Sequence, residues 1–149
     1  MIKRTEREGD PWSGQMAFPG GHKAPGDQTF LETAVREAQE EVGIRLREHE
    51  LLGVLPLVSA RSRRVSVAPF VFQLKRDVLV RSNEEVAESF WVPLSRLERI
   101  EVSKTEVKVE EGNLNVDSYI YNGHAIWGLT FRIINILLGR EIWSREQLP

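Results

Sequence analysis

Residues 20–44 constrain this chain more than any other stretch of its sequence. A glycine-rich turn comes first, and a segment dense in carboxylates follows after a short spacer. On a helix with about 3.6 residues per turn, Glu37, Glu40 and Glu41 stand at positions i, i+3 and i+4, so their carboxylates share one side. Like charges so placed repel by roughly a few tenths of a kcal/mol per pair. Divalent cations between the carboxylates would remove this cost, and Mg²⁺ prefers oxygen ligands.

The same segment has the apolar periodicity of a helix that packs on a core. Its apolar side is formed by Phe30, Leu31, Ala34, Val35, Ala38 and Val42. Gly43 follows as a typical helix terminator, and we expect the acidic side to face away from the core. An acidic run on a helix is more often a solvated face, so the spacing of the carboxylates alone leaves both interpretations open.

The order of glycines and charges resembles the Nudix box. That pattern reads Gly, five residues, Glu, seven residues, then Arg-Glu-aliphatic-any-Glu-Glu-any-Gly-aliphatic, and so many fixed positions make it a specific motif. Here five residues lead from Gly21 to Asp27, and eight more lead to Arg36, which opens Arg-Glu-Ala. These departures, and the stretch Gly-Gln-Met-Ala-Phe-Pro-Gly-Gly at Gly14–Gly21, resemble the branch of the family that hydrolyses coenzyme A.

This resemblance implies an α+β protein, a Nudix-type α/β/α sandwich around a mixed β-sheet, with residues 1–149 as a single domain. It also implies a pyrophosphohydrolase that depends on Mg²⁺ or Mn²⁺ and cleaves a nucleoside diphosphate linked to another group. Coenzyme A is the expected substrate, and ADP-ribose, NADH and dinucleoside polyphosphates are alternatives. A Nudix module that binds a nucleotide without cleaving it is a further alternative, although such a module has no need for a repulsive metal-binding face.

The resemblance also assigns roles to residues. The implied metal ligands are Gly20, Glu37, Glu40 and Glu41, with Gly20 using its carbonyl, and the general base is one of these glutamates, Glu84 or Glu85. Arg36 is expected to pair with Asp27 and to brace the glycine turn against the helix. Gly21 and the arginines Arg61, Arg63 and Arg64 are expected to bind substrate phosphates, because guanidinium groups match phosphate oxygens.

Composition narrows the classes of partner. A chain of 149 residues suffices for one domain with its own core, and a net charge of −2 gives no general attraction to nucleic acid. The absence of cysteine excludes disulfides and thiolate nucleophiles and is compatible with a cytoplasmic protein. The segment Ile126–Leu138 is too short and too polar to span a bilayer. We therefore expect a small-molecule substrate, with neither nucleic acid nor membrane as a partner.

The remaining elements are assigned from alternating and helical patterns. Strands are predicted at Met1–Arg4, Gln15–Phe18, Leu51–Val58, Val65–Leu74, Val78–Arg81 and Val86–Val92, and a hairpin from Glu101–Val109 with Leu114–Tyr121. Helical segments are predicted at Leu94–Arg99 and His124–Leu138. The strands around Leu51–Leu74 are expected to be at least partly buried.

The start of the chain departs from the family. We expect the family's first strand to be missing or encoded differently, and the sheet edge so exposed would favour a homodimer. The coenzyme A branch also carries an arginine four residues before the glycine that matches Gly14, where this chain has Asp10. This difference bears on substrate specificity.

Overall fold

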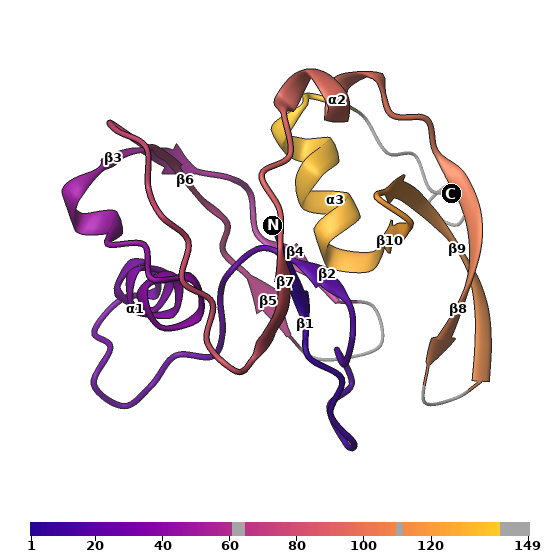
Figure 1. Ribbon diagram of the computed structural model, residues 1–149, viewed down its shortest axis with the longest axis horizontal. Coiled ribbons are helices and arrows are strands. Elements are labelled where there is room, and N and C mark those ends of the chain that lie inside the picture. Colours follow the sequence, from indigo (N-terminus) through magenta and orange to yellow (C-terminus); the bar gives the residue numbers. More distant parts are fainter. Residues whose placement is uncertain (61–64, 110–111, 141–149) are drawn as a thin grey trace.

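A three-stranded antiparallel sheet lies at the centre of the molecule (Figure 1). The computed structural model describes residues 1–60, 65–109 and 112–140. In the central sheet, β1 (Ile2–Arg4) lies between β2 (Met16–Ala17) and β7 (Val86–Ser89). The structure therefore places β1 in the middle of this sheet, whereas the sequence predicted an exposed edge at the start of the chain.

Helices cover the two sides of the central sheet. Helix α1 (Phe30–Val42) packs on one side, where Ile2, Val42 and Val86 form a small core. Helix α3 (Gly128–Leu137) lies on the other side with α2 (Leu94–Arg99) nearby. The larger core there consists of Met16, Leu97, Tyr119, Ile126, Phe131 and Ile134. This arrangement confirms the α+β class and the helix–sheet–helix layering.

The other described strands form further antiparallel sheets. One has the order β10 (His124–Ile126), β9 (Gly112–Tyr121) and β8 (Ser103–Val109). The two-stranded sheets pair β3 (Glu50–Val54) with β6 (Phe70–Gln73), and β4 (Val58–Ser59) with β5 (Ser66–Val67). A 3₁₀ turn, η1 (Leu46–Glu48), follows α1. Within the described ranges every strand pairing is antiparallel, whereas the sequence predicted a mixed sheet.

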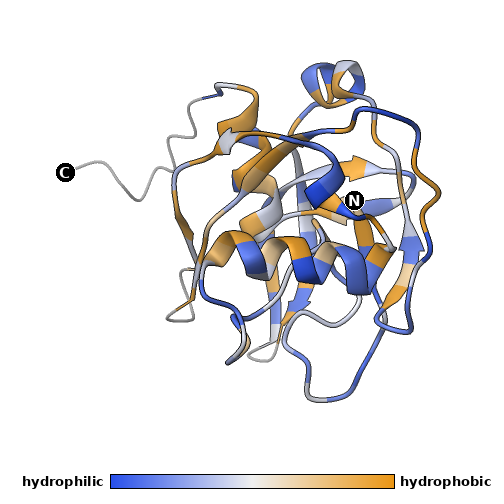
Figure 2. Ribbon diagram, turned by 90° about the vertical axis from the view of Figure 1, so that its left-hand side faces the viewer, coloured by the Kyte–Doolittle hydropathy of each residue, from blue (hydrophilic) through white to orange (hydrophobic). Residues whose placement is uncertain are grey.

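Local sequence explains the bounds of α1. The Thr29 hydroxyl caps its first turn by accepting a hydrogen bond from the Glu32 N–H at 3.1 Å. Gly43 ends the helix in the left-handed region, with φ of 72°, where a residue with a Cβ is disfavoured. Figure 2, in which α1 runs horizontally across the front, shows hydrophobic and hydrophilic residues alternating along the helix. The helix therefore ends at Gly43, as the sequence predicted.

Several predicted strands differ from the structure. Val78–Arg81 forms no strand, and Leu51–Val58 is interrupted after Val54. Strand β3 is largely exposed rather than buried, and its only described strand partner is β6. The predicted C-terminal helix begins later than expected, since His124–Ile126 pairs with β9 before the helix starts at Gly128. The hairpin of β8 with β9 and the helix Leu94–Arg99 are confirmed.

Candidate active site

The turn that begins at Gly20 lies against the acidic side of α1. The Gly20 N–H donates a hydrogen bond of 2.9 Å to Oε2 of Glu41. Gly21 sits so close to Glu37 that a Cβ added to it would lie 2.5 Å from Glu37 Oε1. Only glycine allows this approach without displacing the carboxylate, which explains why the sequence has a glycine at this place.

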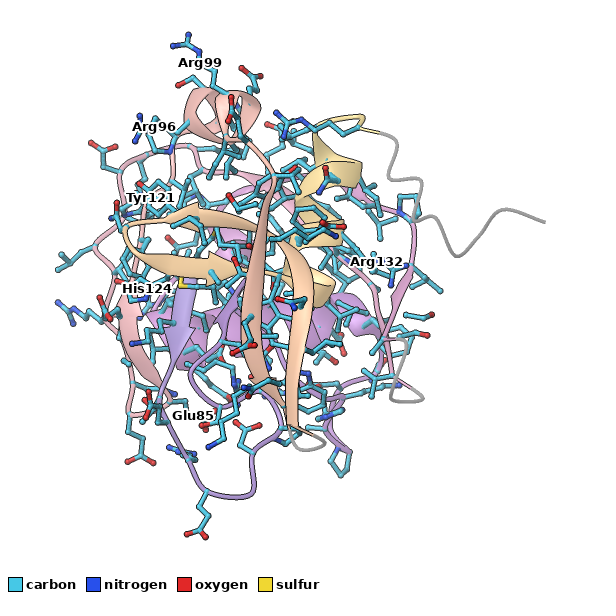
Figure 3. All side chains as sticks on the ribbon, turned by 90° about the vertical axis from the view of Figure 1, so that its right-hand side faces the viewer. Glu85, Arg96, Arg99, Tyr121, His124 and Arg132 are labelled. Atoms are coloured by element: carbon cyan, nitrogen blue, oxygen red, sulfur yellow. The ribbon has the colours of Figure 1, made fainter. Side chains whose placement is uncertain are left out.

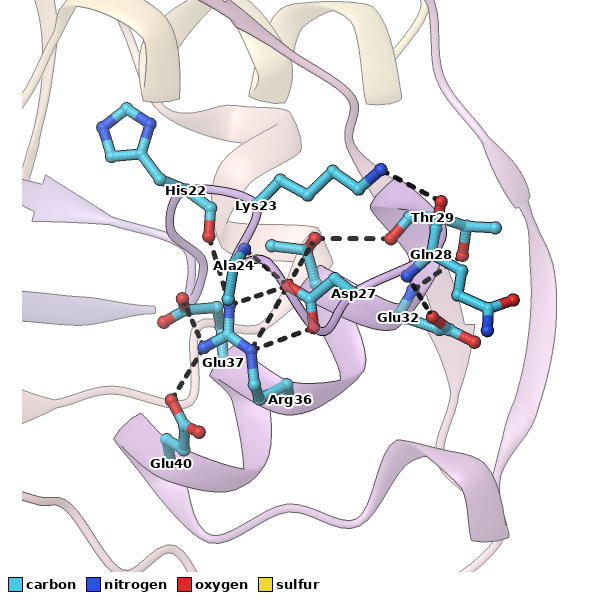
Figure 4. A network of polar contacts seen from close by, with 11 residues as sticks. His22, Lys23, Ala24, Asp27, Gln28, Thr29, Glu32, Arg36, Glu37 and Glu40 are labelled. Atoms are coloured by element: carbon cyan, nitrogen blue, oxygen red, sulfur yellow. Dashed lines mark hydrogen bonds and ion pairs between the residues drawn. The ribbon is translucent and has the colours of Figure 1, made fainter.

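Arg36 holds the turn on the helix (Figure 4). Its guanidinium contacts three carboxylates: Asp27 at 3.0 Å, Glu37 at 2.8 Å and Glu40 at 2.8 Å. It also donates a hydrogen bond of 3.1 Å to the carbonyl oxygen of His22, on the turn itself. The hydrogen bonds from Arg36 hold the pKa of Asp27 well below its usual range. The predicted pairing of Asp27 with Arg36 is thus present, and it bridges the turn and α1.

Glu41 is almost completely buried. Only 2% of its surface is exposed, although the amphipathic pattern predicted that the acidic side would face away from the core. Burial raises the pKa of Glu41 to about 7, opposed by the hydrogen bond from Gly20 and assisted by the negative charges of Glu37 and Glu85. The prediction was wrong because the turn and the strand β1 cover this part of the helix.

An ion pair that the sequence did not reveal reaches Glu41 from β1. Arg4 contacts Asp10 at 2.9 Å with Nη2 and lies 3.8 Å from Glu41 Oε1 with Nη1. The Asp10 carboxylate also accepts a hydrogen bond from the backbone N–H of Trp12. Asp10 therefore stands as the anionic partner of an arginine, at the position where the coenzyme A branch has an arginine. The only signal for this ion pair in the sequence was Arg4 itself, at the end of the short predicted strand Met1–Arg4.

The other predicted residues are less buried. The side chain of Glu40 is 54% exposed, and that of Glu84 is 88% exposed. Glu85 is half-buried, and its charge acts on Glu41. Arg61, Arg63 and Arg64 lie outside the described residues, so their predicted contact with phosphates stays a prediction.

The cations of α2 do not serve this site. Figure 3 shows Arg96 and Arg99 at the top of the view, pointing outward, and Glu85 near the bottom. Since Glu85 is one of the charges that act on Glu41, these two arginines lie well away from the acidic side of α1. A phosphate clamp, if it is built from arginine, must come from other segments.

The carboxylates around Glu41 fit a hard divalent cation in their chemistry. In the parts of the chain that the structure describes, no three acidic or histidine side chains stand close enough to hold a metal ion in their present conformations. However, Glu41 is buried beside the like charge of Glu37, and burial opposes its ionisation. A cation at this place would favour the ionised carboxylates, and oxygen donors of this kind suit Mg²⁺ and Mn²⁺.

A broad cleft adjoins these carboxylates. Its lining includes the glycine turn, Glu37, Glu40 and Glu41. A separate hollow of about 450 Å³ lies between the segment Asp10–Met16 and strand β8, and His124 and Trp127 also line it. This smaller hollow contains none of the α1 glutamates. The acidic side of α1 therefore faces the larger cleft and not the smaller hollow.

Comparison with known proteins places this geometry in a family. The profile of the NUDIX domain matches residues 1–111, which include the glycine turn and all of α1. The chain belongs to the Nudix hydrolase family. Divalent metals such as Mg²⁺ are general to this family, whose members act on small nucleoside diphosphate derivatives.

Curated relatives of this Nudix protein come from several bacteria. The protein named uncharacterized Nudix hydrolase NudL of Photorhabdus laumondii is 40% identical over 129 residues, which cover 84% of this chain and 67% of the relative. The NudL of Yersinia enterocolitica is 39% identical over 130 residues, covering 84% and 65%. That of Pectobacterium atrosepticum is 36% identical over 139 residues, covering 92% and 72%. The chain thus spans about two thirds of the length of these relatives.

No helix in the described part of this Nudix protein combines the length and apolar character needed to cross a membrane. The longest helix among the described residues, α1, has 13 residues and carries the acidic side of the Nudix box. Strand β2 leads into the glycine turn, which opens that box. The fold therefore brings together Gly20, Glu37 and Glu41, and leaves the side chain of Glu40 more exposed on the same side.

Proposed function

We propose that the protein is a divalent-metal-dependent pyrophosphohydrolase, which cleaves the diphosphate of a nucleoside diphosphate linked to another group. The observation that carries the proposal is the buried carboxylate of Glu41, set beside Glu37 against a glycine turn. A fold gains no stability from two adjacent carboxylates in such a place. They make chemical sense as ligands of a cation that binds with the substrate.

In this proposal, the residues of the site divide into metal ligands and a residue that positions them. Glu37, Glu40 and Glu41, with the carbonyl oxygen of Gly20, would hold Mg²⁺ or Mn²⁺. When bound, the ion neutralises the bridging phosphates and lowers the pKa of the attacking water. Arg36 holds the turn through its hydrogen bond of 3.1 Å to the His22 carbonyl, and it contacts Glu37 and Glu40 at 2.8 Å. Glu40 is exposed, so little packing opposes a change of its side-chain conformation.

Proton transfer from the water needs a carboxylate at the cleft. Glu85 suits this task better than Glu84, since Glu85 lines the cleft and its charge reaches Glu41. Glu84 points its side chain to solvent and lies 3.8 Å from Arg7. Glu37, Glu40 and Glu41 remain alternatives for the same role.

Coenzyme A is the substrate that we propose first. The stretch Gly14–Gly21 and the spacing from Gly21 to Arg36 support it, and the products would be phosphopantetheine and adenosine 3′,5′-bisphosphate. The ion pair of Asp10 with Arg4 favours the alternatives, because a carboxylate occupies the position where the coenzyme A branch has an arginine. ADP-ribose, NADH and dinucleoside polyphosphates therefore belong in the same experiment.

The experiment incubates purified protein with Mg²⁺ or Mn²⁺ and each of these substrates, and separates the products by chromatography. Glu41→Gln is the test variant. Glu48→Gln is the control, since Glu48 lies on the exposed turn η1 and pairs with Arg76. We expect release of adenosine 3′,5′-bisphosphate from coenzyme A by the wild type and the control, and its loss in the test variant.

The other outcomes separate the alternatives. Cleavage of another panel member keeps the enzyme class and changes the substrate. Binding of a nucleotide without any cleavage would overturn the hydrolase proposal in favour of a binding module. Activity that persists unchanged in Glu41→Gln would show that the buried carboxylate has no part in the reaction.

A further inference from the structure

Two aromatic rings meet at the cleft beside the glycine turn. The ring centroids of Trp12 and His22 are 6.2 Å apart, and their planes are inclined by 56°. Both residues line the same cleft as Glu37 and Glu41. The rings come from segments on either side of β2, so the fold rather than the sequence brings them together.

The loop that carries Trp12 is held in place by its own hydrogen bonds. The Trp12 N–H donates to Oδ1 of Asp10 at 2.9 Å, and the Trp12 carbonyl accepts from the N–H of Gln15 at 3.2 Å. The Gln15 side chain donates to the carbonyl of Pro11 at 3.1 Å. Asp10 is itself anchored to Arg4. A loop fixed by so many contacts loses little conformational entropy when a ligand binds to it.

His22 belongs to the glycine turn of the proposed reaction site. Its carbonyl accepts a hydrogen bond from Arg36, the residue that braces the turn. It follows Gly20 by two residues, so their Cα atoms are at most about 8 Å apart, given about 3.8 Å for each peptide unit. The ring pair thus adjoins the turn at which a diphosphate would bind.

We propose that Trp12 and His22 bind the purine base of the nucleoside diphosphate and so determine which end of the substrate is recognised. This inference rests on the proposed function. A purine offers a flat π face, and stacking of a base on an aromatic side chain contributes substantially to binding whatever the identity of the base. The flexible arm of pantetheine has no such face. The rings therefore act on substrate affinity and not on the chemical step.

The test measures binding of two probes by titration calorimetry in the presence of Mg²⁺. ADP carries the base, and inorganic pyrophosphate has the same anhydride without it. We expect Trp12→Leu and His22→Ala to weaken ADP binding by about tenfold or more and to leave pyrophosphate binding unchanged. Trp12→Phe keeps an aromatic face, and we expect it to retain most of the ADP affinity. In turnover assays, we expect Trp12→Leu and His22→Ala to raise KM with little change in kcat.

Each other outcome contradicts the inference in a recognisable way. Equal weakening of ADP and pyrophosphate would mean that the rings only support the fold of the turn. Unchanged ADP binding in both variants would show that the base lies elsewhere, as would a wild type that binds pyrophosphate as tightly as ADP. A wild type that binds neither probe and cleaves no substrate would overturn the proposed function as well.

Discussion

Replacement of Glu41 by glutamine tests how much the ionisation of this buried carboxylate lowers the free energy of unfolding. Burial raises the pKa of this carboxyl from 4.5 to about 7. Between these two pH values, Glu41 of the metal-free protein is protonated in the folded state and ionised in the unfolded chain. The resulting contribution to the free energy of unfolding is complete below about pH 4.5 and is lost as the pH rises through 7. The glutamine side chain of the variant cannot titrate, and its amide oxygen still accepts the hydrogen bond from Gly20.

The size of the effect follows from the shift of the pKa. One pKa unit corresponds to about 1.4 kcal/mol, so the full cost of ionising Glu41 in the fold is about 3 kcal/mol, of which about 2.5 kcal/mol develops between pH 5 and pH 8. With an m value of about 2 kcal/mol per M of urea, the unfolding midpoint of the wild type falls by about 1 M relative to Glu41→Gln over this interval.

The assay is urea unfolding followed by tryptophan fluorescence, with EDTA present, at both pH values. Comparison of the two proteins cancels the titration of groups that do not interact with Glu41. A difference in unfolding free energy that is the same at pH 5 and pH 8 would refute the argument from burial. At pH 8, Mg²⁺ in place of EDTA is expected to stabilise the wild type more than the variant, since the ion binds only the folded state.

Three further perturbations test separate parts of the structure. Asp27→Asn removes a carboxylate whose pKa lies below its usual 3.8; we expect lower stability than the wild type above about pH 4, and a difference that shrinks as the pH falls further, measured by thermal unfolding. Gly21→Ala forces Glu37 to move, because the new Cβ would lie 2.5 Å from its Oε1, and we expect kcat/KM to fall by about tenfold or more. Gly26→Ala is the control, since a Cβ at Gly26 would have open space, and we expect it to retain activity. Equal activity of the two variants would contradict the close approach of Gly21 to Glu37. Asn135→Ala removes the oxygen that accepts the hydrogen bond of 2.7 Å from the buried hydroxyl of Tyr119. We expect the free energy of unfolding to fall by about 1–3 kcal/mol. A loss below about 0.5 kcal/mol in urea unfolding would show that this contact is dispensable.

Local sequence was sufficient for the elements whose signals lie within a few residues. The cap at Thr29, the apolar spacing and Gly43 define α1, and the alternation in β9 defines the hairpin. The pairing of Asp27 with Arg36 also followed, because a fixed motif spacing places the turn beside the helix. In each case the partners are close in sequence or belong to one helix, so the geometry leaves few alternatives.

Residues distant in sequence decided the rest of the site. The amphipathic pattern placed Glu41 at the surface, but β1 and the glycine turn cover it, and no periodicity within α1 contains that information. Strand β3 was expected to be partly buried because its residues are apolar, yet burial depends on whether another element packs on it.

The sequence by itself determined the family, the helix that carries the carboxylates and the glycine that lies against Glu37. Only the tertiary structure decided that Glu41 is buried beside Arg4, and that Trp12 and His22 meet at the cleft. The physical reason is that helix periodicity and motif spacing describe one continuous stretch of the sequence. Burial, pKa shifts and contacts between loops depend on how separate segments pack, and that packing is a property of the whole chain.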